Sequence, residues 1–390
     1  MTLRNQIDHG ADLKGELVGY ALTPGFARLL ASEMSGTLEY TDDRQSAVIY
    51  AVESMLFDRP ERGGKTVLER YLLGHKQLSL DDRAVLESWR ERAVYGVFEV
   101  IARKSDRLTL VNVIDELSYE VYSTLGAAAI SGASRGSYVL TRVLPVGDSW
   151  ILSGIQRLFG KRDRRIVGAL LAGLIENDPT GAFRNPVKRE RALEINGAYH
   201  DVFLGLFGAD SVAGTGREAA EHLRRFIAAC SAQVNATAPE APPAPEWAAA
   251  DAVATSAYEN FPDELLNADD VVLLNHKVKG FALFQNYGQV EDAHRTPPSD
   301  AHADGVALVR EYLNDESIPA YVLARLASAY PETVDTLYHL VLERPEFRWA
   351  VDGDALLRQR KPESYATADV PDLVVLPQLV IDAMADASGK

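Results

Sequence analysis

The stretch from Tyr95 to Gly154 constrains the fold of this 390-residue chain most, because it alone holds several strand-like runs in succession. The runs are rich in β-branched and aromatic residues, and Gly, Ser and Asp mark the turns between them. Gly147-Asp148, between two apolar runs, is a hairpin signal. The predicted strands are Tyr95–Arg103, Leu108–Ile114, Ser118–Thr124, Ser137–Val146 and Ser149–Ser153. Five short strands interrupted by a longer loop are typical of a small β-barrel, either SH3-like or OB-like.

Helical patterns dominate on both sides of this stretch, so we expect an α+β protein. Residues 1–93 form a predicted N-terminal helical region, and 94–154 form the barrel. Residues 155–234, beginning with a predicted helix over 155–177, form a helical region packed on the barrel. Four prolines over 235–245 predict a Pro/Ala-rich linker at 235–247. Residues 248–390 form a smaller, mostly helical C-terminal domain, with a helix expected at Asp270–Lys279 and a short strand at Phe281–Gln285.

The composition indicates a cytoplasmic protein. Cys230 is the single cysteine, so an internal disulfide and a Cys-rich zinc site are both excluded. The first residues lack the apolar run of a signal peptide, and the apolar run Val167–Ile175 is too short to span a bilayer, so no membrane partner is expected. The net charge of −16 argues against a surface that binds nucleic acid as a whole, but it leaves room for a local basic face.

Two short motifs resemble phosphate-binding loops, and the start of a helix explains both more simply. Arg62–Thr66 ends like a P-loop, but the required first glycine is replaced by Arg59 and the preceding stretch is helical in pattern. Gly214–Ala219 approximates a dinucleotide-binding turn. Thr215 and Glu218 within it stand in capping-box register, as expected at the start of a helix. The sequence therefore predicts no cofactor.

Candidate metal and nucleophile residues are equally weak. Asp300, His302 and Asp304 alternate and could share one face of an extended loop, but a solvated acidic loop is the simpler interpretation. Cys230 follows an apolar helical face and is expected in the core. We predict no metal site.

The strongest functional signal is a basic segment that directly follows the last predicted strand. Between Arg157 and Arg191 there are nine Arg or Lys residues against four Asp or Glu. Small barrels bind single-stranded nucleic acid through a basic groove and stacking aromatic residues. The candidate ligand-binding residues are Arg157, Lys161, Arg162, Arg164, Arg165, Tyr122, Tyr138 and Trp150. The alternative to ligand binding is that the aromatic residues pack in the barrel core and that the arginines form ion pairs with acidic helices.

Two groups of residues resemble a poorly characterised family of bacterial proteins, some of which carry a C-terminal SEC-C-type cysteine motif. The first group is LSLDDRAVLESW, YGVFEVI and RVLPVGDSWILSG. The second is KGFALFQNYGQVEDAH, YLNDESIPAYVLARLASAYPE and FRWAVDGDALLRQRKP. The chain ends in DAMADASGK without a cysteine, so the resemblance implies no zinc site here.

These features favour a non-enzymatic binding or interaction module. Its partner, nucleic acid or another protein, would contact the barrel and the adjacent basic segment. The alternative is an enzyme of the hydrolase or nuclease class with a site at the domain junction. The sequence indicates no oligomeric state.

Overall fold

The computed structural model describes residues 2–37, 43–61, 63–237, 261–296, 303–373 and 376–382. The chain forms two compact units, and each is described by itself. The first unit comprises Met1–Asn185 and Leu376–Lys390, and the second comprises Pro186–Val375. No helix in the described ranges is long and apolar enough to cross a membrane.

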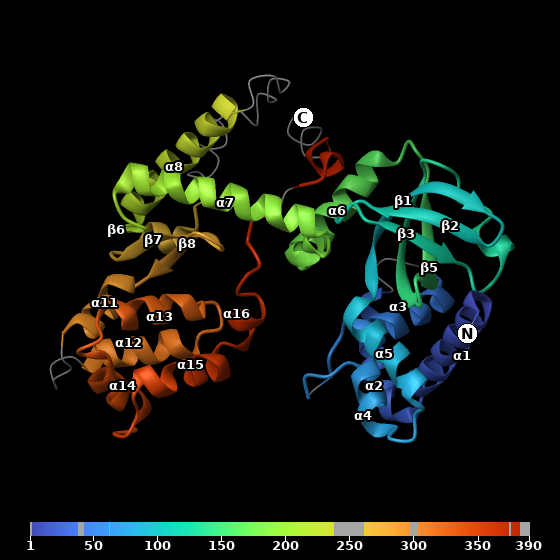
Figure 1. Ribbon diagram of the computed structural model, residues 1–390, viewed down its shortest axis with the longest axis horizontal. Coiled ribbons are helices and arrows are strands. Elements are labelled where there is room, and N and C mark those ends of the chain that lie inside the picture. Colours follow the sequence, from blue (N-terminus) through green and yellow to red (C-terminus); the bar gives the residue numbers. More distant parts are fainter. Residues whose placement is uncertain are drawn as a thin grey trace. The chain divides into compact units, whose positions relative to one another are not determined.

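The first unit contains a five-stranded mixed sheet that closes into a ring (Figure 1). Its strands are β1 (Val94–Lys104), β2 (Arg107–Asn112), β3 (Ser118–Tyr122), β4 (Tyr138–Val146) and β5 (Ser149–Phe159). The order around the ring is β1-β2-β3-β5-β4, and pairing of β1 with β4 closes it. Neighbouring strands are antiparallel except β3 and β5, which are parallel. The five predicted strands are confirmed.

Strand β4 belongs to two cores, because its successive side chains point to opposite faces of the sheet. Val143 packs in one buried cluster with Phe98 of β1 and Val121 of β3. Leu144 packs in a second cluster with the N-terminal helices, which Figure 1 shows grouped beside the ring. These helices are α1 (Leu3–Ala21), η1 (Pro24–Phe26), α2 (Ala27–Thr37), α3 (Arg44–Phe57), α4 (Val67–Gly74) and α5 (Leu80–Arg92). The short η2 (Ala127–Ile130) lies in the loop before β4, and α6 (Arg164–Asn177) and η3 (Pro179–Arg184) follow β5.

Strand β5 runs to Phe159, so the prediction that a helix begins at residue 155 is wrong. Gly154 has a φ of 66°, and the register of β4 against β5 shifts between Leu140 and Arg142 at this level. A glycine with positive φ beside a register shift is a β-bulge, which bends a strand without ending it. In the sequence, the same glycine resembles the end of a strand.

The second unit places a three-stranded antiparallel sheet between two groups of helices, as Figure 1 shows. The strands are β6 (Ser211–Gly214), β7 (Val271–His276) and β8 (Gly280–Gln285). One face of the sheet packs on α7 (Pro186–Phe207) and α8 (Gly216–Thr237), and α10 (Asp263–Leu266) packs on α8. The other face packs on helices from the C-terminal group. This group is α11 (Tyr287–Arg295), α12 (Ala303–Asn314), α13 (Ala320–Ala329), α14 (Val334–Leu342), α15 (Trp349–Arg360) and α16 (Pro362–Ala366).

The helix predicted at Asp270–Lys279 is wrong, because this segment is the central strand β7. Val271 and Leu273 pack toward α7 and α8, whereas Val272 and Leu274 pack toward the C-terminal helices. A strand buried on both faces lacks the alternation that distinguishes it from a buried helix. The strand expected at Phe281–Gln285 is confirmed as β8. The predicted linker begins inside α8, and its residues 238–247 lie outside the described residues.

Candidate functional site

A cleft of about 860 Å³ lies in the first unit between the outer side of the ring and three helices. Tyr95 of β1, Leu140 and Arg142 of β4, and Ile155 and Arg157 of β5 form one wall. Helices α2, α3 and α6 supply the facing walls. The cleft size falls within the range of small-molecule sites, which is about 300–1,000 Å³.

Arg142 is the most deeply placed cation of this cleft, with 5% of its surface exposed. Its Nη2 donates to Asp58, and its Nε lies 3.5 Å from Glu53 Oε2. The guanidinium also lies 4.7 Å from the ring centroid of Phe57 and 5.2 Å from that of Tyr95. Two carboxylates and two aromatic faces therefore offset the cost of burying this charge.

Glu53 of α3 extends the ion pairing to other elements. It accepts a hydrogen bond from Ser153 Oγ of β5 at 3.0 Å and pairs with Lys14 of α1. Burial raises the pKa of the Asp58 carboxyl, and the charge of Arg142 opposes that rise, while about half of the Asp58 side chain stays exposed. The network connects α1, α3, β4 and β5 around one buried arginine.

Two tyrosines and Arg157 converge in the same cleft. Burial raises the pKa of Tyr95 to about 12 and raises that of Tyr50, so both phenols remain protonated and can donate hydrogen bonds at neutral pH. The charge of Arg157 opposes the rise at both phenols, and all three residues line the cleft. Arg157 has no ion-pair partner within the described residues, and its guanidinium lies 5.1 Å from the ring centroid of Phe159.

The three predicted stacking residues are already in contact with other groups. Tyr138 is 6% exposed, and burial raises the pKa of its phenol. The charge of Arg164 opposes this rise. The guanidinium of Arg107 lies 5.8 Å from the ring centroid of Tyr122, and that of Arg92 lies 5.6 Å from the ring centroid of Trp150. These contacts favour packing over base stacking for all three rings.

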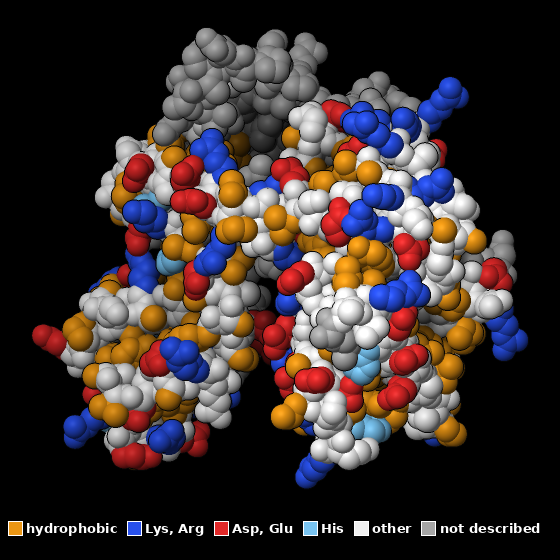
Figure 2. All heavy atoms as spheres, turned by 45° about the vertical axis from the view of Figure 1, so that its right-hand side comes forward, with side chains coloured by type: hydrophobic (Ala, Val, Ile, Leu, Met, Phe, Trp, Pro, Cys, Tyr) orange, Lys and Arg blue, Asp and Glu red, His pale blue; other side chains and the backbone are white. Residues whose placement is uncertain are grey.

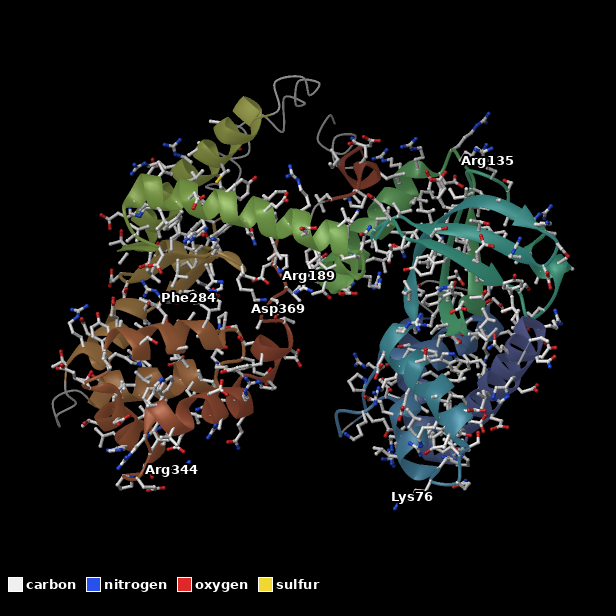
Figure 3. The ribbon with its side chains drawn as sticks, in the orientation of Figure 1. Lys76, Arg135, Arg189, Phe284, Arg344 and Asp369 are labelled. Atoms are coloured by element: carbon white, nitrogen blue, oxygen red, sulfur yellow. The ribbon has the colours of Figure 1, made fainter. Side chains whose placement is uncertain are left out.

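The remaining predicted cations are exposed where β5 ends and α6 begins. The aliphatic part of Lys161 lies against Gly136, where a Cβ on the glycine would stand 2.9 Å from Lys161 Cε. The loop before β4 therefore adds the exposed Arg135, labelled in Figure 3, to the group. We define the basic rim as Arg135, Lys161, Arg162, Arg164 and Arg165.

The rim is largely free of acidic partners. Within the described residues, one of its cations has an ion pair, which is that of Arg164 with Asp382 at 3.5 Å. Figure 2 shows Lys and Arg side chains gathered over the upper part of this unit, with some Asp and Glu between them. The rim therefore presents an excess of positive charge on an acidic protein.

The later part of the basic segment is ion-paired instead. Arg184 Nε lies 2.8 Å from Asp115 Oδ2 in the first unit. In the second unit, Arg189 pairs with Asp369 at 2.9 Å, a contact visible in Figure 3, and Arg191 pairs with Glu194. The basic segment is thus divided between the two units.

Both phosphate-loop resemblances are helix caps, of which the sequence predicts the one at Thr215 and only a helix start at Thr66. The Thr66 side chain accepts from the amide of Glu69, whose carboxylate accepts from the amide of Thr66. Thr215 and Glu218 make the same reciprocal pair. Cys230 is buried, and burial raises the pKa of its thiol to about 12, as expected of a core residue.

No cluster suited to a metal ion occurs in the part of the chain that the structure describes. The predicted loop residues Asp300 and His302 lie outside the described residues.

Arg142, Glu53 and the cleft are features of the candidate site that the sequence did not predict. One signal was available: Arg142 is the single charged residue in the run YVLTRVLPV. A charge inside an otherwise mostly apolar strand is informative, because charged residues are seldom buried without a partner. The identity of that partner could not be found, since Glu53 belongs to a distant helix.

Comparisons with protein-family models, with curated proteins and with solved structures gave no match to this chain. The resemblance to the bacterial family with SEC-C-bearing members stays a prediction.

Proposed function

We propose that this chain binds the phosphate backbone of single-stranded nucleic acid through the basic rim, and that the ring is a small SH3-like or OB-like barrel. The observation that carries the proposal is the grouping of Arg135, Lys161, Arg162 and Arg165. All four are exposed and have no ion-pair partner within the described residues. A chain with a net charge of −16 keeps these cations together where two loops of the ring meet.

The contacts of the rim favour recognition of phosphates over recognition of bases. Arginine and lysine donate to phosphate oxygens and release condensed counterions, which makes binding depend on salt. The aromatic residues near the ring are engaged in packing, so base stacking adds little. We therefore expect weak sequence preference.

Fluorescence anisotropy with a labelled 20-nucleotide oligothymidylate tests the proposal. If four or five phosphates are neutralised, the slope of log K against log salt is about −3, at roughly −0.7 per phosphate in single strands. Affinity should then fall roughly 60-fold between 50 and 200 mM salt. Reversing Arg162 and Arg165 to Glu should abolish binding.

The matched control is Lys65→Glu with Lys76→Glu, which makes the same charge change on exposed residues of the helical part. Figure 3 shows Lys76 at the opposite end of this unit from Arg135. The control should bind nearly as well as the unmodified chain. Equal losses in both double variants, or binding that ignores salt, would contradict the proposal.

A protein partner is the second candidate, and one observation favours it. Leu158 and Ile166 beside the rim are 41% and 53% exposed, as suits a contact with an apolar surface. Leu158→Ser should then weaken partner binding more than Arg162→Glu does. The hydrolase or nuclease alternative stays a prediction, and shortening of the labelled oligonucleotide in the same assay would support it.

A further inference from the structure

Three cations and three carboxylates line the cleft against the ring, and one of these cations has no carboxylate partner among the described residues. Glu33 lies 3.3 Å from Arg59, while Glu53 and Asp58 neutralise Arg142 and Lys14. Arg157 remains without an ion-pair partner within the described residues. The cleft lining is therefore neutral overall, and Arg157, an exposed residue, is the cation in it that can pair with an anion.

That charge stands beside an apolar surface. In the pairing of β4 with β5, Leu140 is directly opposite Arg157, and Ile155 of β5 lines the same cleft. Leu170 of α6 also lines the cleft. One end of a ligand would thus meet a guanidinium, and its body would meet aliphatic side chains.

Hydrogen-bond donors complete the polar end. The protonated phenols of Tyr50 and Tyr95 line the same cleft and feel the charge of Arg157. Phenol and guanidinium groups both donate to a carboxylate. If the ligand carried a second anionic group, that group would lie near the carboxylates of Glu33, Glu53 and Asp58 and would be repelled by them. A ligand with one negative charge is therefore favoured over a dianion.

We infer that this cleft binds a small amphipathic monoanion, namely a carboxylate with an apolar body. The carboxylate contacts Arg157 and the two phenols, and the body lies against Leu140, Ile155 and Leu170. This site is separate from the nucleic-acid function proposed for the basic rim and does not depend on it.

Displacement of the fluorescent probe 1-anilinonaphthalene-8-sulfonate tests the inference. Decanoate is the test ligand, and decanol supplies the same body without charge. Decanoate should displace the probe at least tenfold more strongly than decanol. Arg157→Gln should remove that preference, and Tyr95→Phe should weaken decanoate two- to fivefold while keeping the ring that lies over Arg142.

Arg162→Gln is the matched control, because it removes an exposed arginine of the rim from the same unit. It should leave displacement by decanoate unchanged, with circular dichroism confirming that each variant is folded. Equal displacement by decanoate and decanol, or equal effects of Arg157→Gln and Arg162→Gln, would overturn the inference. Failure to displace the probe below millimolar decanoate would overturn it as well.

Discussion

Replacing Arg142 should strongly weaken the first unit. Arg142→Met keeps a long side chain but removes the positive charge from beside Glu53 and Asp58. Removing one partner of a buried ion pair costs about 3–5 kcal/mol, because the other charge stays buried. Glu53 retains Lys14, and about half of the Asp58 side chain is exposed, so the low end of that range applies. The thioether also keeps part of the contact with the two aromatic rings. We expect a loss of about 3 kcal/mol in the free energy of unfolding.

Urea unfolding followed by tryptophan fluorescence measures this loss. Replacing Trp247 and Trp349 by Phe leaves Trp89 and Trp150, both in the first unit, as the reporters. Both reporters must lie in the first unit, because the two units need not unfold in one transition. Arg165→Met is the control, and an exposed cation without an ion pair should contribute less than about 0.5 kcal/mol.

A double-mutant cycle separates ion pairing from packing. Glu53→Gln combined with Arg142→Met should cost less than the two single changes together, with a coupling of about 1–3 kcal/mol. Strict additivity would show that the two side chains do not interact. A loss below about 1 kcal/mol for Arg142→Met alone would refute the view that its charge is buried at a cost.

Two further predictions concern the second unit. His294 is fully buried, and burial lowers its pKa below 6.5, so protonation favours the unfolded state. The free energy of unfolding should therefore be highest above about pH 6.5 and should fall as the pH drops below that value. His294→Gln should make the free energy of unfolding depend less on pH, as measured by urea titrations at pH 5–8. The same pH profile in His294→Gln and in the unmodified chain would contradict this role of His294. Gly216→Ala places a Cβ 1.8 Å from the carbonyl oxygen of Leu265 and should cost about 3 kcal/mol or more. Gly205→Ala, with open space around it inside α7, should instead stabilise by about 0.5–1 kcal/mol, and equal thermal shifts for the two variants would contradict the reasoning.

Local chemistry made much of the fold predictable. The strands of the ring stand out because turn residues interrupt β-branched runs, and the cap at Thr215 stands out because its partner Glu218 lies three residues away. Strand β7 was missed because both of its faces are buried, which removes the alternation. An element was predicted correctly where neighbouring residues in the sequence carry its pattern, and it was missed where they do not.

The cleft depended on pairing between distant residues, which no local pattern contains. Tyr95 stands opposite Arg142 because of the register of β1 against β4, and α3 then brings Glu53 to the same place. Neither the register nor the helix position follows from composition or spacing. The charge of Arg142 within a mostly apolar strand indicated that a carboxylate partner exists, but the sequence did not identify that partner.

The position of Arg157 shows how one wrong element changes a functional hypothesis. On the predicted helix, Arg157, Lys161 and Arg164 would share one face, because residues four and seven apart are neighbours there. On β5, successive side chains point in opposite directions. Leu158 therefore approaches the loop at Gly132, while Arg157 points into the cleft. The predicted group of basic residues is thus divided between two candidate sites, the exposed rim proposed to bind a polyanion and the partly apolar cleft proposed to bind a monoanion. Because the sites share no cation, Arg157→Gln should spare nucleic-acid binding, and reversing Arg162 and Arg165 should spare decanoate binding.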